Sequence, residues 1–526
     1  MTTSTYDVAV IGYGPTGATA ANLLGQLGQR VVVIERDPDI YNRARAISTD
    51  EEVMRIWQRA GLAERLAADM LPDRPLHFVD SRGDTFIALR TPSHNCGHPS
   101  QQFLYQPAVD TVLREGVDRF PNVDVLLSHE CLRVTTTPDD VELMLADLNT
   151  DSFLRIRASY VIAADGGSSP TRGQFGIGYT GRTYGERWVV IDTEVLEPWP
   201  GHDSLRFHCD PAYPTVDCPT PLGHHRWEYP ARGNVADANL ISDAAVWRML
   251  HGQGITEKHV RILRAVIYRH HVRIADRWRV GRVFLAGDAA HAMPPWIGQG
   301  MSAGVRDAAN LCWKLAAALD GSAPDSLLDS YQTERMPHVR EVTKRAVRVG
   351  RIITEPRPAL AALRNTVMRA LMKVPHLPTK LHATMWIPEA RYRDGYFVGG
   401  GPASGCQLPQ PWLIDEKGAG VRLDDALHGQ WTLLHLGVAP PGNQAWAALG
   451  VNIIRLNGPE GYPAPDTLVD GGHSLVDWFS SKGAEAVVVR PDGFVYAGAG
   501  PRQLLPAPPP DLRLCGENRR PQGVLS

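Results

Sequence analysis

Three glycines near the start of the chain have the spacing of a turn that holds a dinucleotide. They follow the apolar run of residues 8–11 and precede a helix-like stretch, residues 18–27. Glycine allows the tight turn and lets the backbone approach a pyrophosphate, and the following helix offers unpaired N–H groups to the phosphates. The residues expected to contact the cofactor at this turn are Gly12, Gly14, Pro15, Thr16 and Gly17.

An acidic residue closes the second apolar run, residues 31–34. Glu35 lies about twenty residues after the turn, where a carboxylate accepts hydrogen bonds from ribose hydroxyls. Arg36, its neighbour, is also expected to contact the cofactor. The first strand, the turn, the helix, the second strand and the acidic residue follow one another at the expected spacing, and this order predicts an ADP-binding unit. On these residues alone, the unit could hold either FAD or NAD.

A second candidate site follows a later apolar run, residues 283–286. There the Asp288 carboxylate could accept hydrogen bonds from the ribityl hydroxyls of a flavin, and a loop rich in proline and glycine then opens a long helix. The N-terminal amides of that helix could stabilise negative charge on a reduced flavin. His291 is expected to be structural. The residues predicted to contact the cofactor here are Gly287, Asp288, Gly298, Gln299, Gly300, Met301 and Ser302.

Three further positions are predicted to face the cofactor, each with a plainer alternative. Arg45, favoured over Arg43, would lie beside the flavin or its phosphates, unless it belongs to a solvated loop. Gln106 would bond to the pyrophosphate or the ribityl chain, unless it only caps the helix that follows. Asp165, after the apolar run of residues 160–164, could mark a generic turn, but with Gly166 and Arg172 it resembles the motif that flavoprotein hydroxylases place near the pyrophosphate of the cofactor.

Residues 182–271 alternate between apolar and polar types, and this pattern predicts a half-buried antiparallel sheet. The region is rich in aromatic and basic residues, so the sheet could form one wall of an aromatic pocket. An arginine there could pair with a substrate carboxylate, although each residue could equally belong to an ordinary sheet surface. The predicted substrate contacts are Arg206, Tyr213, Arg226, Tyr229 and Trp296.

Length and composition limit the classes of function. The 526 residues are too many for one simple core, so two or three domains are expected. A net charge of -3 gives no electrostatic case for nucleic acid or an anionic membrane. No apolar run approaches the roughly 18 residues of a spanning helix. The seven cysteines lack C-x-x-C spacing, and the N-terminus lacks a basic leader, so a cytoplasmic protein without a metal site or redox dithiol is expected.

Taken together, the three motifs resemble those of the single-component FAD-dependent aromatic hydroxylases of the phenol hydroxylase type. The similarity covers at least residues 6–340 and is greatest to hydroxylases that act on 3-(3-hydroxyphenyl)propionate. The residues of the loop before Gly298 vary among related hydroxylases, so the resemblance does not identify the particular phenolic acid. Besides the cofactor motifs, the residues that carry the resemblance are 115–123, 209–211, 285–291 and 310–316.

The resemblance implies a mixed α/β (α+β) fold built around a Rossmann-like FAD-binding domain. That domain would be discontinuous, covering residues 1–180 and 272–345, with an antiparallel β-sheet substrate domain inserted at 181–271. A helical segment, 346–398, would lead to a thioredoxin-like C-terminal domain, 399–526. Because this domain lacks a redox dithiol, packing or homodimerisation is its expected role.

The resemblance also implies the reaction. FAD, bound non-covalently, would be reduced by NADH or NADPH and would deliver oxygen from a C4a-hydroperoxide to a small phenolic substrate. No second glycine-rich unit for NAD is evident, which fits a transient visit by the nicotinamide. Pro295, Gly298 and Gly300 would border the reacting ring. The alternatives are a different aromatic or polyketide-like substrate and a flavin-dependent halogenase, although the usual halogenase stretch Trp-x-Trp-x-Ile-Pro is absent. A C-terminal interaction module on a flavoprotein is the non-enzymatic alternative.

Overall fold

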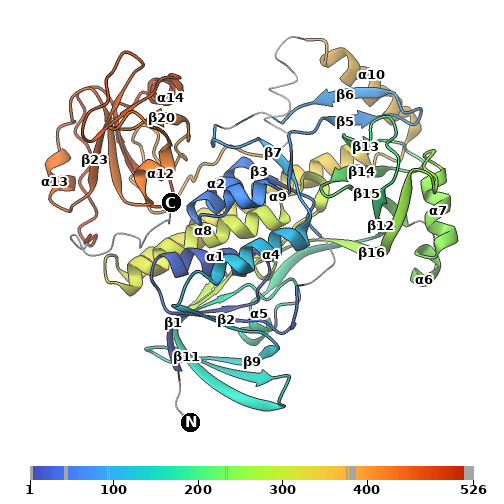
Figure 1. Ribbon diagram of the computed structural model, residues 1–526, viewed down its shortest axis with the longest axis horizontal. Helices are drawn as coiled ribbons and strands as arrows, with labels where there is room; N and C mark the ends of the chain where they lie inside the picture. The colour runs from blue at the N-terminus through green and yellow to red at the C-terminus, as the bar shows by residue number, and fades with distance from the viewer. Residues whose placement is uncertain are drawn as a thin grey trace.

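The computed structural model describes residues 4–40, 45–91, 93, 95–231, 233, 235–374, 377 and 387–514. These residues form two eight-stranded sheets, one seven-stranded sheet and one three-stranded sheet. In Figure 1 the N-terminal sheet lies at the bottom, the second large sheet at the right and the C-terminal sheet at the left, with the long helices α8 and α9 between them. The predicted mixed α/β fold is confirmed.

The apolar runs that flank the glycine turn form the centre of the N-terminal sheet. β1 pairs in parallel with β2 on one side and with β11 on the other, and β18 extends the parallel order beyond β11. Buried on both faces, such strands are continuously apolar. The strands of this sheet are β1 (Ser4–Ile11), β2 (Val31–Ile34), β8 (Val123–Leu126), β9 (His129–Thr136), β10 (Val141–Asp147), β11 (Ser152–Ala163), β17 (Arg279–Val280) and β18 (Val283–Leu285).

One strand of this sheet lies elsewhere than the sequence indicates. The run at 123–127 resembles the start of a β-meander that continues at 141–145, but β8 pairs in parallel with β2. The antiparallel part is instead formed by β9, β10 and the long β11. A parallel partner about ninety residues away leaves no local signature, because parallel strands need a long crossover between them.

Helices cover the upper face of this sheet, where α1 packs against α8 (Figure 1). The two helices approach closely at Gly304, where a Cβ atom would lie 2.2 Å from the Thr16 Oγ1 atom. Only glycine permits that distance. The helices of this region are α1 (Pro15–Gln26), α2 (Glu51–Arg59), α3 (Ala63–Ala67), α4 (Gln106–Val117), α8 (Gly300–Leu319) and α9 (Ser330–Ile353). Two further helices lie elsewhere: α5 (Pro170–Gln174) packs against β9, and α10 (Pro358–Leu371) packs against the second large sheet (Figure 1).

The second large sheet contains the alternating region predicted at 181–271. β12 and β16 pair over most of their length, and β15, β14 and β13 follow in order. Two strands from the N-terminal region, β5 and β6, complete the sheet because β5 pairs in parallel with β13. The strands are β5 (Leu76–Val79), β6 (Thr85–Leu89), β12 (Tyr179–Val195), β13 (Leu205–His208), β14 (Thr215–Thr220), β15 (His224–Ala231), β16 (Val260–Ala275) and β19 (His291–Ala292).

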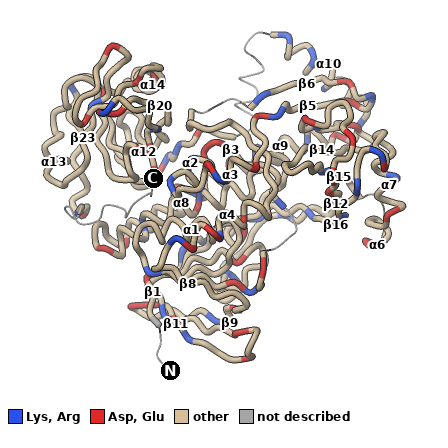
Figure 2. The backbone as a smooth tube through the Cα atoms, viewed as in Figure 1, with Lys and Arg blue, Asp and Glu red and all other residues tan. Residues whose placement is uncertain are grey.

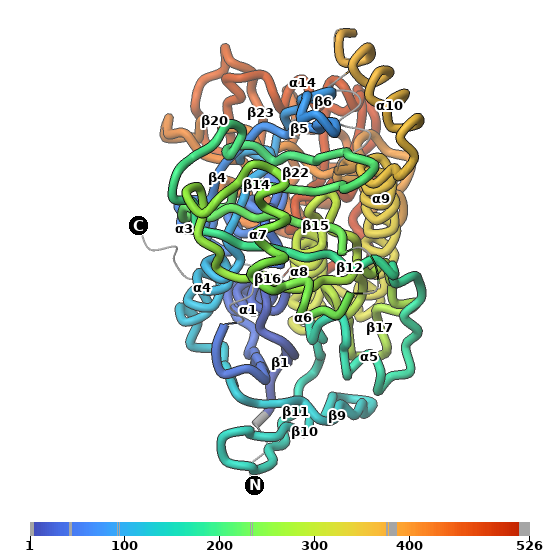
Figure 3. Tube along the Cα trace, turned by 90° about the vertical axis from the view of Figure 1, so that its right-hand side faces the viewer, coloured from blue at the N-terminus to red at the C-terminus, as the bar shows by residue number. Residues whose placement is uncertain are grey.

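The two faces of this sheet have different neighbours. The outer face packs against α6 (Asp237–Leu240) and α7 (Asp243–His251), which lie on the far side from the rest of the molecule (Figures 1 and 3). Trp227 and Tyr229 are buried in that outer cluster with Val246 and Leu250 of α7. The inner face therefore remains for the cofactor domain.

The C-terminal sheet has a thioredoxin-like arrangement. β24, β23 and β22 are mutually parallel, and β25 and β26 continue the sheet in antiparallel order. Its elements are β20 (Trp412–Ile414), β21 (Gly420–Arg422), α12 (Leu423–Leu427), β22 (Thr432–Leu436), α13 (Asn443–Ala447), β23 (Asn452–Asn457), β24 (Thr467–Val469), α14 (Ser474–Lys482), β25 (Ala486–Val489) and β26 (Val495–Ala499).

Buried ion pairs attach this domain to the rest of the chain. Asp424 of α12 accepts hydrogen bonds from Arg55 of α2 at 2.6 and 2.8 Å. Glu334 of α9 pairs with Arg490 at 2.6 Å and with Lys314 at 2.7 Å. Between the domains, residues 387–398 contain no helix, although the sequence predicts a helical segment as far as residue 398.

The remaining short elements join these layers. They are β3 (Ser48–Asp50), β4 (Leu71–Pro72), β7 (Gln101–Phe103) and the 3-10 turns η1 (Gly287–Ala289), η2 (Pro295–Ile297) and η3 (Asp325–Asp329). Basic and acidic residues are interspersed along all parts of the chain (Figure 2). None of the helices in the described ranges has both the length and the apolar character that a bilayer crossing requires.

Candidate active site

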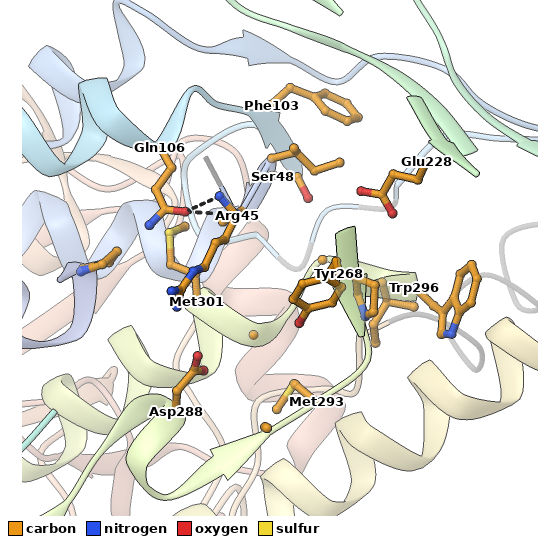
Figure 4. Close-up of a pocket in the computed structure, with 18 of the residues that line it drawn as sticks. Arg45, Ser48, Phe103, Gln106, Glu228, Tyr268, Asp288, Met293, Trp296 and Met301 are labelled. Carbon is orange, nitrogen blue, oxygen red and sulfur yellow. Dashed lines mark hydrogen bonds between the residues drawn. The ribbon is translucent and has the colours of Figure 1, made fainter. Parts of the chain in front are cut away.

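A cavity of about 270 Å³ lies where the glycine turn, the start of α8 and the inner face of the second sheet meet. Gly14, Pro15 and Thr16 contribute from the turn, and Gly300 and Met301 from the first turn of α8. Figure 4 shows the polar residues Arg45, Gln106 and Asp288 on one side of this space and the aromatic residues on the other. Both motifs predicted to bind a cofactor therefore face one cavity.

The glycine turn has the geometry expected of a phosphate site. Gly12 has a φ of +98°, and a Cβ atom there would lie 2.4 Å from the Ala164 carbonyl oxygen. A Cβ atom on Gly17 would lie 2.0 Å from the Gly12 carbonyl oxygen. At Gly14, in contrast, a Cβ atom would meet nothing within 4 Å. Gly12 and Gly17 are thus required by the fold, while Gly14 borders open space at the start of α1.

Glu35 lies beside the same turn. Its carboxylate accepts hydrogen bonds from the backbone amides of Tyr13, at 2.7 Å, and of Asp37, at 2.9 Å. A carboxylate has about four acceptor positions, so capacity remains for ribose hydroxyls. Arg36 is exposed, with its guanidinium 3.6 Å from Asp37.

Arg45 and Gln106 both line the cavity, and they are joined to each other. The Gln106 side-chain oxygen accepts hydrogen bonds from the backbone amides of Arg45, at 2.8 Å, and Ala46, at 2.9 Å (Figure 4). Gln106 therefore holds the loop that carries Arg45. Beneath it, burial raises the pKa of Asp110 to about 7, despite the nearby guanidinium of Arg114. Arg43, the alternative to Arg45, lies outside the described residues.

Asp165 has a different position from the one expected. Its Oδ2 atom accepts a hydrogen bond from the Thr171 amide at 3.1 Å, near the start of α5, and the residue does not line the cavity. Its neighbours Ala164 and Gly166 do line it. The Asp-Gly motif therefore shapes the cavity through its backbone, while the carboxylate holds the turn.

The second cofactor motif, at Gly287 and Asp288, is anchored to α8 by a hydrogen bond. Asp288 is exposed and lines the cavity, whereas the amide of Gly287 donates to Asp307 of α8 at 3.1 Å. Gly298 has a φ of +64° and precedes α8, and a Cβ atom there would lie 2.4 Å from Ser48 Oγ. Gly298 is therefore a position where only glycine fits.

The first residues of α8 combine cavity-facing and buried side chains. Gln299 is buried: its amide nitrogen donates to Asp50 at 3.0 Å, and its oxygen accepts from Arg306 at 3.0 Å. Arg306 also pairs with Asp50 at 2.7 Å. The hydroxyl of Ser302 is buried with no hydrogen-bond partner among the described residues. This network fixes the loop that brings Gly300 and Met301, the first residues of α8, to the cavity.

Pro295 and Trp296 form another side of the cavity. The Trp296 ring makes edge contacts with Trp188, at 5.1 Å between centroids, and with His270, at 5.3 Å. Burial lowers the pKa of His270 to about 4, so this histidine is neutral at pH 7 and serves as an aromatic neighbour. Trp296 is the predicted substrate residue that the structure does place at the cavity.

The other four predicted substrate residues do not line the cavity, which corrects the expectation from sequence. Arg206 pairs with the buried Asp217 at 3.1 Å, and Tyr229 lies in the outer cluster. Tyr213 packs against Tyr229 with ring centroids 5.9 Å apart. Successive side chains of a strand point to opposite faces, so Arg206 and Tyr229 belong to the outer face of the sheet.

Arg226 lies on the inner face but behind the cavity. Its guanidinium donates to Asp192 at 2.6 Å and to the Arg45 carbonyl oxygen at 3.2 Å. Its charge is therefore balanced by a carboxylate of the next strand, and it supports the loop that carries Arg45.

Residues that the sequence did not single out complete the cavity. Glu228 and Tyr268 face it from β15 and β16 (Figure 4). Apolar side chains surround them: Ile47, Phe103, Leu205, Phe207, Val216 and Met293. Glu228 is two residues from Arg226 on β15, and the two side chains therefore share a face of the sheet. This alternation was the only signal in the sequence that could have pointed to Glu228 as a cavity residue. It could not be used because the sequence does not show which face of the sheet meets the cofactor domain.

This arrangement is that of an FAD-binding enzyme. The glycine turn leaves open space for a pyrophosphate at Gly14, Asp288 and Glu35 present carboxylates to hydroxyl groups, and the α8 amides offer positive charge to the flavin ring. The residues present thus fit FAD along its length. The apolar, aromatic half of the cavity continues from the flavin end and suits a ring-shaped substrate.

Comparison with known proteins agrees with this class. Residues 5–346 match the model of a family described as FAD binding domain, and residues 405–508 match that of the HcaD C-terminal domain. Two curated relatives are named 3-(3-hydroxy-phenyl)propionate/3-hydroxycinnamic acid hydroxylase. The one from Mycobacterium sp. (strain JLS) is 33% identical and aligns over 95% of this chain and 90% of its own. The one from Klebsiella pneumoniae subsp. pneumoniae is also 33% identical and aligns over 96% and 95%.

The fold is also that of a solved flavin-dependent monooxygenase, PieE in complex with FAD and substrate. The TM-score is 0.80 at 23% identity, and the match covers 94% of this chain and 96% of that one. The chain belongs to the FAD-binding family of aromatic hydroxylases. It is an FAD-dependent aromatic monooxygenase, as the sequence motifs predict.

Proposed function

We propose that the enzyme uses NADH or NADPH and O2 to hydroxylate a phenolic aromatic compound. The observation that supports this most is the continuity of the cavity: its flavin end, at Asp288 and Met301, opens directly onto an aromatic end, at Tyr268 and Trp296 (Figure 4). When bound, FAD supplies electron transfer and oxygen activation. The relatives' names make 3-(3-hydroxyphenyl)propionate or a related phenolic acid the first substrate to test.

The residues of this chain have distinct parts in that reaction. The amides at Gly300 and Met301 favour negative charge on the flavin ring. Pro295 and Gly298 border the space where the ring and the substrate meet, and the apolar walls exclude water from it. Because the sequence contains no second glycine-rich nucleotide unit, the nicotinamide cofactor is expected to visit transiently.

The test combines reduction kinetics with product analysis. Anaerobic stopped-flow measurements follow flavin reduction by NADH and by NADPH, with and without each member of a panel of phenols. A productive phenol should accelerate reduction, because reduction without a ring to oxidise would waste the reductant as hydrogen peroxide. In air, mass analysis should then find one oxygen atom added to that phenol. If no phenol accelerates reduction or gains oxygen, the proposed function is wrong.

A further inference from the structure

The aromatic end of the cavity is formed by a row of side chains across three strands. Phe207 of β13 lies opposite Val216 of β14, and Val216 lies opposite Glu228 of β15. Residues at paired positions are neighbours on one face of a sheet, and all three line the cavity. Glu228 thus places a carboxyl group in an otherwise apolar row.

This carboxyl group has no partner in the described part of the chain: no side chain or backbone amide there donates a hydrogen bond to it or forms a salt bridge with it. Burial raises the pKa of Glu228, the guanidinium of Arg226 lowers it, and the carboxylate of Asp192 raises it. Glu228 is half-buried, and a carboxyl group that is held partly away from water without a partner is costly. Its place at a cavity wall is therefore explained best by a ligand that supplies the partner.

The cations near Glu228 are bound to other carboxylates. Arg226 and Arg264 both donate to Asp192, and Arg206 pairs with Asp217 on the opposite face. Arg45 lies across the cavity from Glu228, on the side of Gln106 and Asp288 (Figure 4). A substrate carboxylate at the Glu228 end would therefore meet a carboxyl group first.

We propose that Glu228 determines substrate specificity by accepting a hydrogen bond from a donor group of the aromatic substrate and by disfavouring a carboxylate at that position. The inference rests on the proposed function and narrows its substrate class to phenolic compounds that carry no carboxylate at this end. A second carboxylate is either repelled or must bring a proton with it, and both cost free energy. The preferred substrate then carries a neutral or cationic donor, such as a hydroxyl, amide or amine group, at this end.

Two ligands that differ only in that group test the proposal. The dissociation constants of 3-(3-hydroxyphenyl)propionate and of its carboxamide are measured on the oxidised holoenzyme from the change in flavin absorbance, without NAD(P)H. The kcat/KM values for both are then measured in air. We expect the carboxamide to bind more tightly and to react with a higher kcat/KM, each by about tenfold or more, because like charges brought together at a binding site disfavour the acid.

Matched variants assign the preference to Glu228. In Glu228→Gln the dissociation constants of the two ligands should differ by no more than about threefold, and so should their kcat/KM values. The reason is that the isosteric amide carries no charge and can also donate a hydrogen bond to a carboxylate. In Glu228→Asp the preference for the carboxamide should remain. The control is Glu194→Gln on β12, whose carboxylate pairs with Arg261 away from the cavity. Flavin content and thermal midpoint identify any variant that does not fold.

The outcomes separate this proposal from the proposed function. If phenols are hydroxylated but the wild type treats acid and carboxamide alike, or prefers the acid, the role of Glu228 is wrong while the hydroxylase stands. If no phenol is hydroxylated, the proposed function fails, and the binding measurements still decide the preference. Absence of binding by both ligands would also overturn the role of Glu228.

Discussion

The carboxylate of Asp307, in the second turn of α8, accepts a hydrogen bond from the backbone amide of Gly287 at 3.1 Å. The same carboxylate accepts from His291 at 2.7 Å and from Arg335 at 2.9 Å. Burial alone would raise the pKa of Asp307, but His291 and Arg335 lower it below its ordinary value. One buried group thus joins the Gly287 turn to α8, and His291 is one of the donors that hold this junction.

Asp307→Asn should destabilise this junction. The substitution leaves the buried guanidinium of Arg335 without its carboxylate, and such a broken pair typically costs about 3–5 kcal/mol. We expect a lower free energy of unfolding, measured by urea denaturation, and a raised dissociation constant for FAD. Asp320→Asn, at the exposed end of the same helix, is the control and should change neither value. If the free energy of unfolding of Asp307→Asn equals that of the wild type, the Asp307 carboxylate does not stabilise this junction.

Gly14→Val should abolish FAD binding while leaving the fold intact. The side chain would enter the open space in front of the turn, where nothing lies within 4 Å, and would occupy the place of the pyrophosphate. Flavin content after purification and circular dichroism measure the two effects. Gly17→Val is the contrasting variant: its side chain would collide with the Gly12 carbonyl, so the protein itself should not fold. Full flavin occupancy in Gly14→Val would show that this turn does not hold the phosphates.

Asp110→Asn should change how the stability of the apoprotein depends on pH. Burial raises the pKa of Asp110 from 3.8 to about 7, so the folded chain holds this proton more tightly than the unfolded chain does. The stability from this group is complete below pH 3.8 and is lost as the pH rises through about 7. We expect Asp110→Asn to lack that loss between about pH 4 and pH 7 in urea denaturation.

Asp118→Asn, at the exposed end of α4, is the control for that experiment and should follow the wild-type curve. Parallel curves for wild type and Asp110→Asn would show that Asp110 does not titrate in this range.

Cys406→Ser should leave hydroxylation near the wild-type rate. The thiol is buried, it is a free cysteine, and burial raises its pKa, so the reactive thiolate is suppressed. Turnover measured with and without a thiol-blocking reagent checks this. The other cysteine of this domain, residue 515, lies outside the described residues, and the double variant with serine at both positions tests both thiols. A loss of turnover in a well-folded variant would reveal a thiol function in the C-terminal domain.

The sequence by itself determined the cofactor end of the site. Gly12, Gly14, Gly17 and Glu35 act within one strand–turn–helix–strand unit, so their spacing along the chain is also their spacing in space. The Asp288 motif and the start of α8 follow the same rule, since strand, turn and helix are consecutive. Local geometry is what sequence patterns encode most directly.

Only the tertiary structure decided the substrate end. Which face of the second sheet meets the cavity depends on its packing against the cofactor domain and against α7, and that choice places Glu228 inside and Tyr229 outside. Alternation along a strand gives two faces but does not say which one faces a ligand. The parallel pairing of β5 with β13 likewise joins segments more than a hundred residues apart, and nothing in either segment alone specifies its partner.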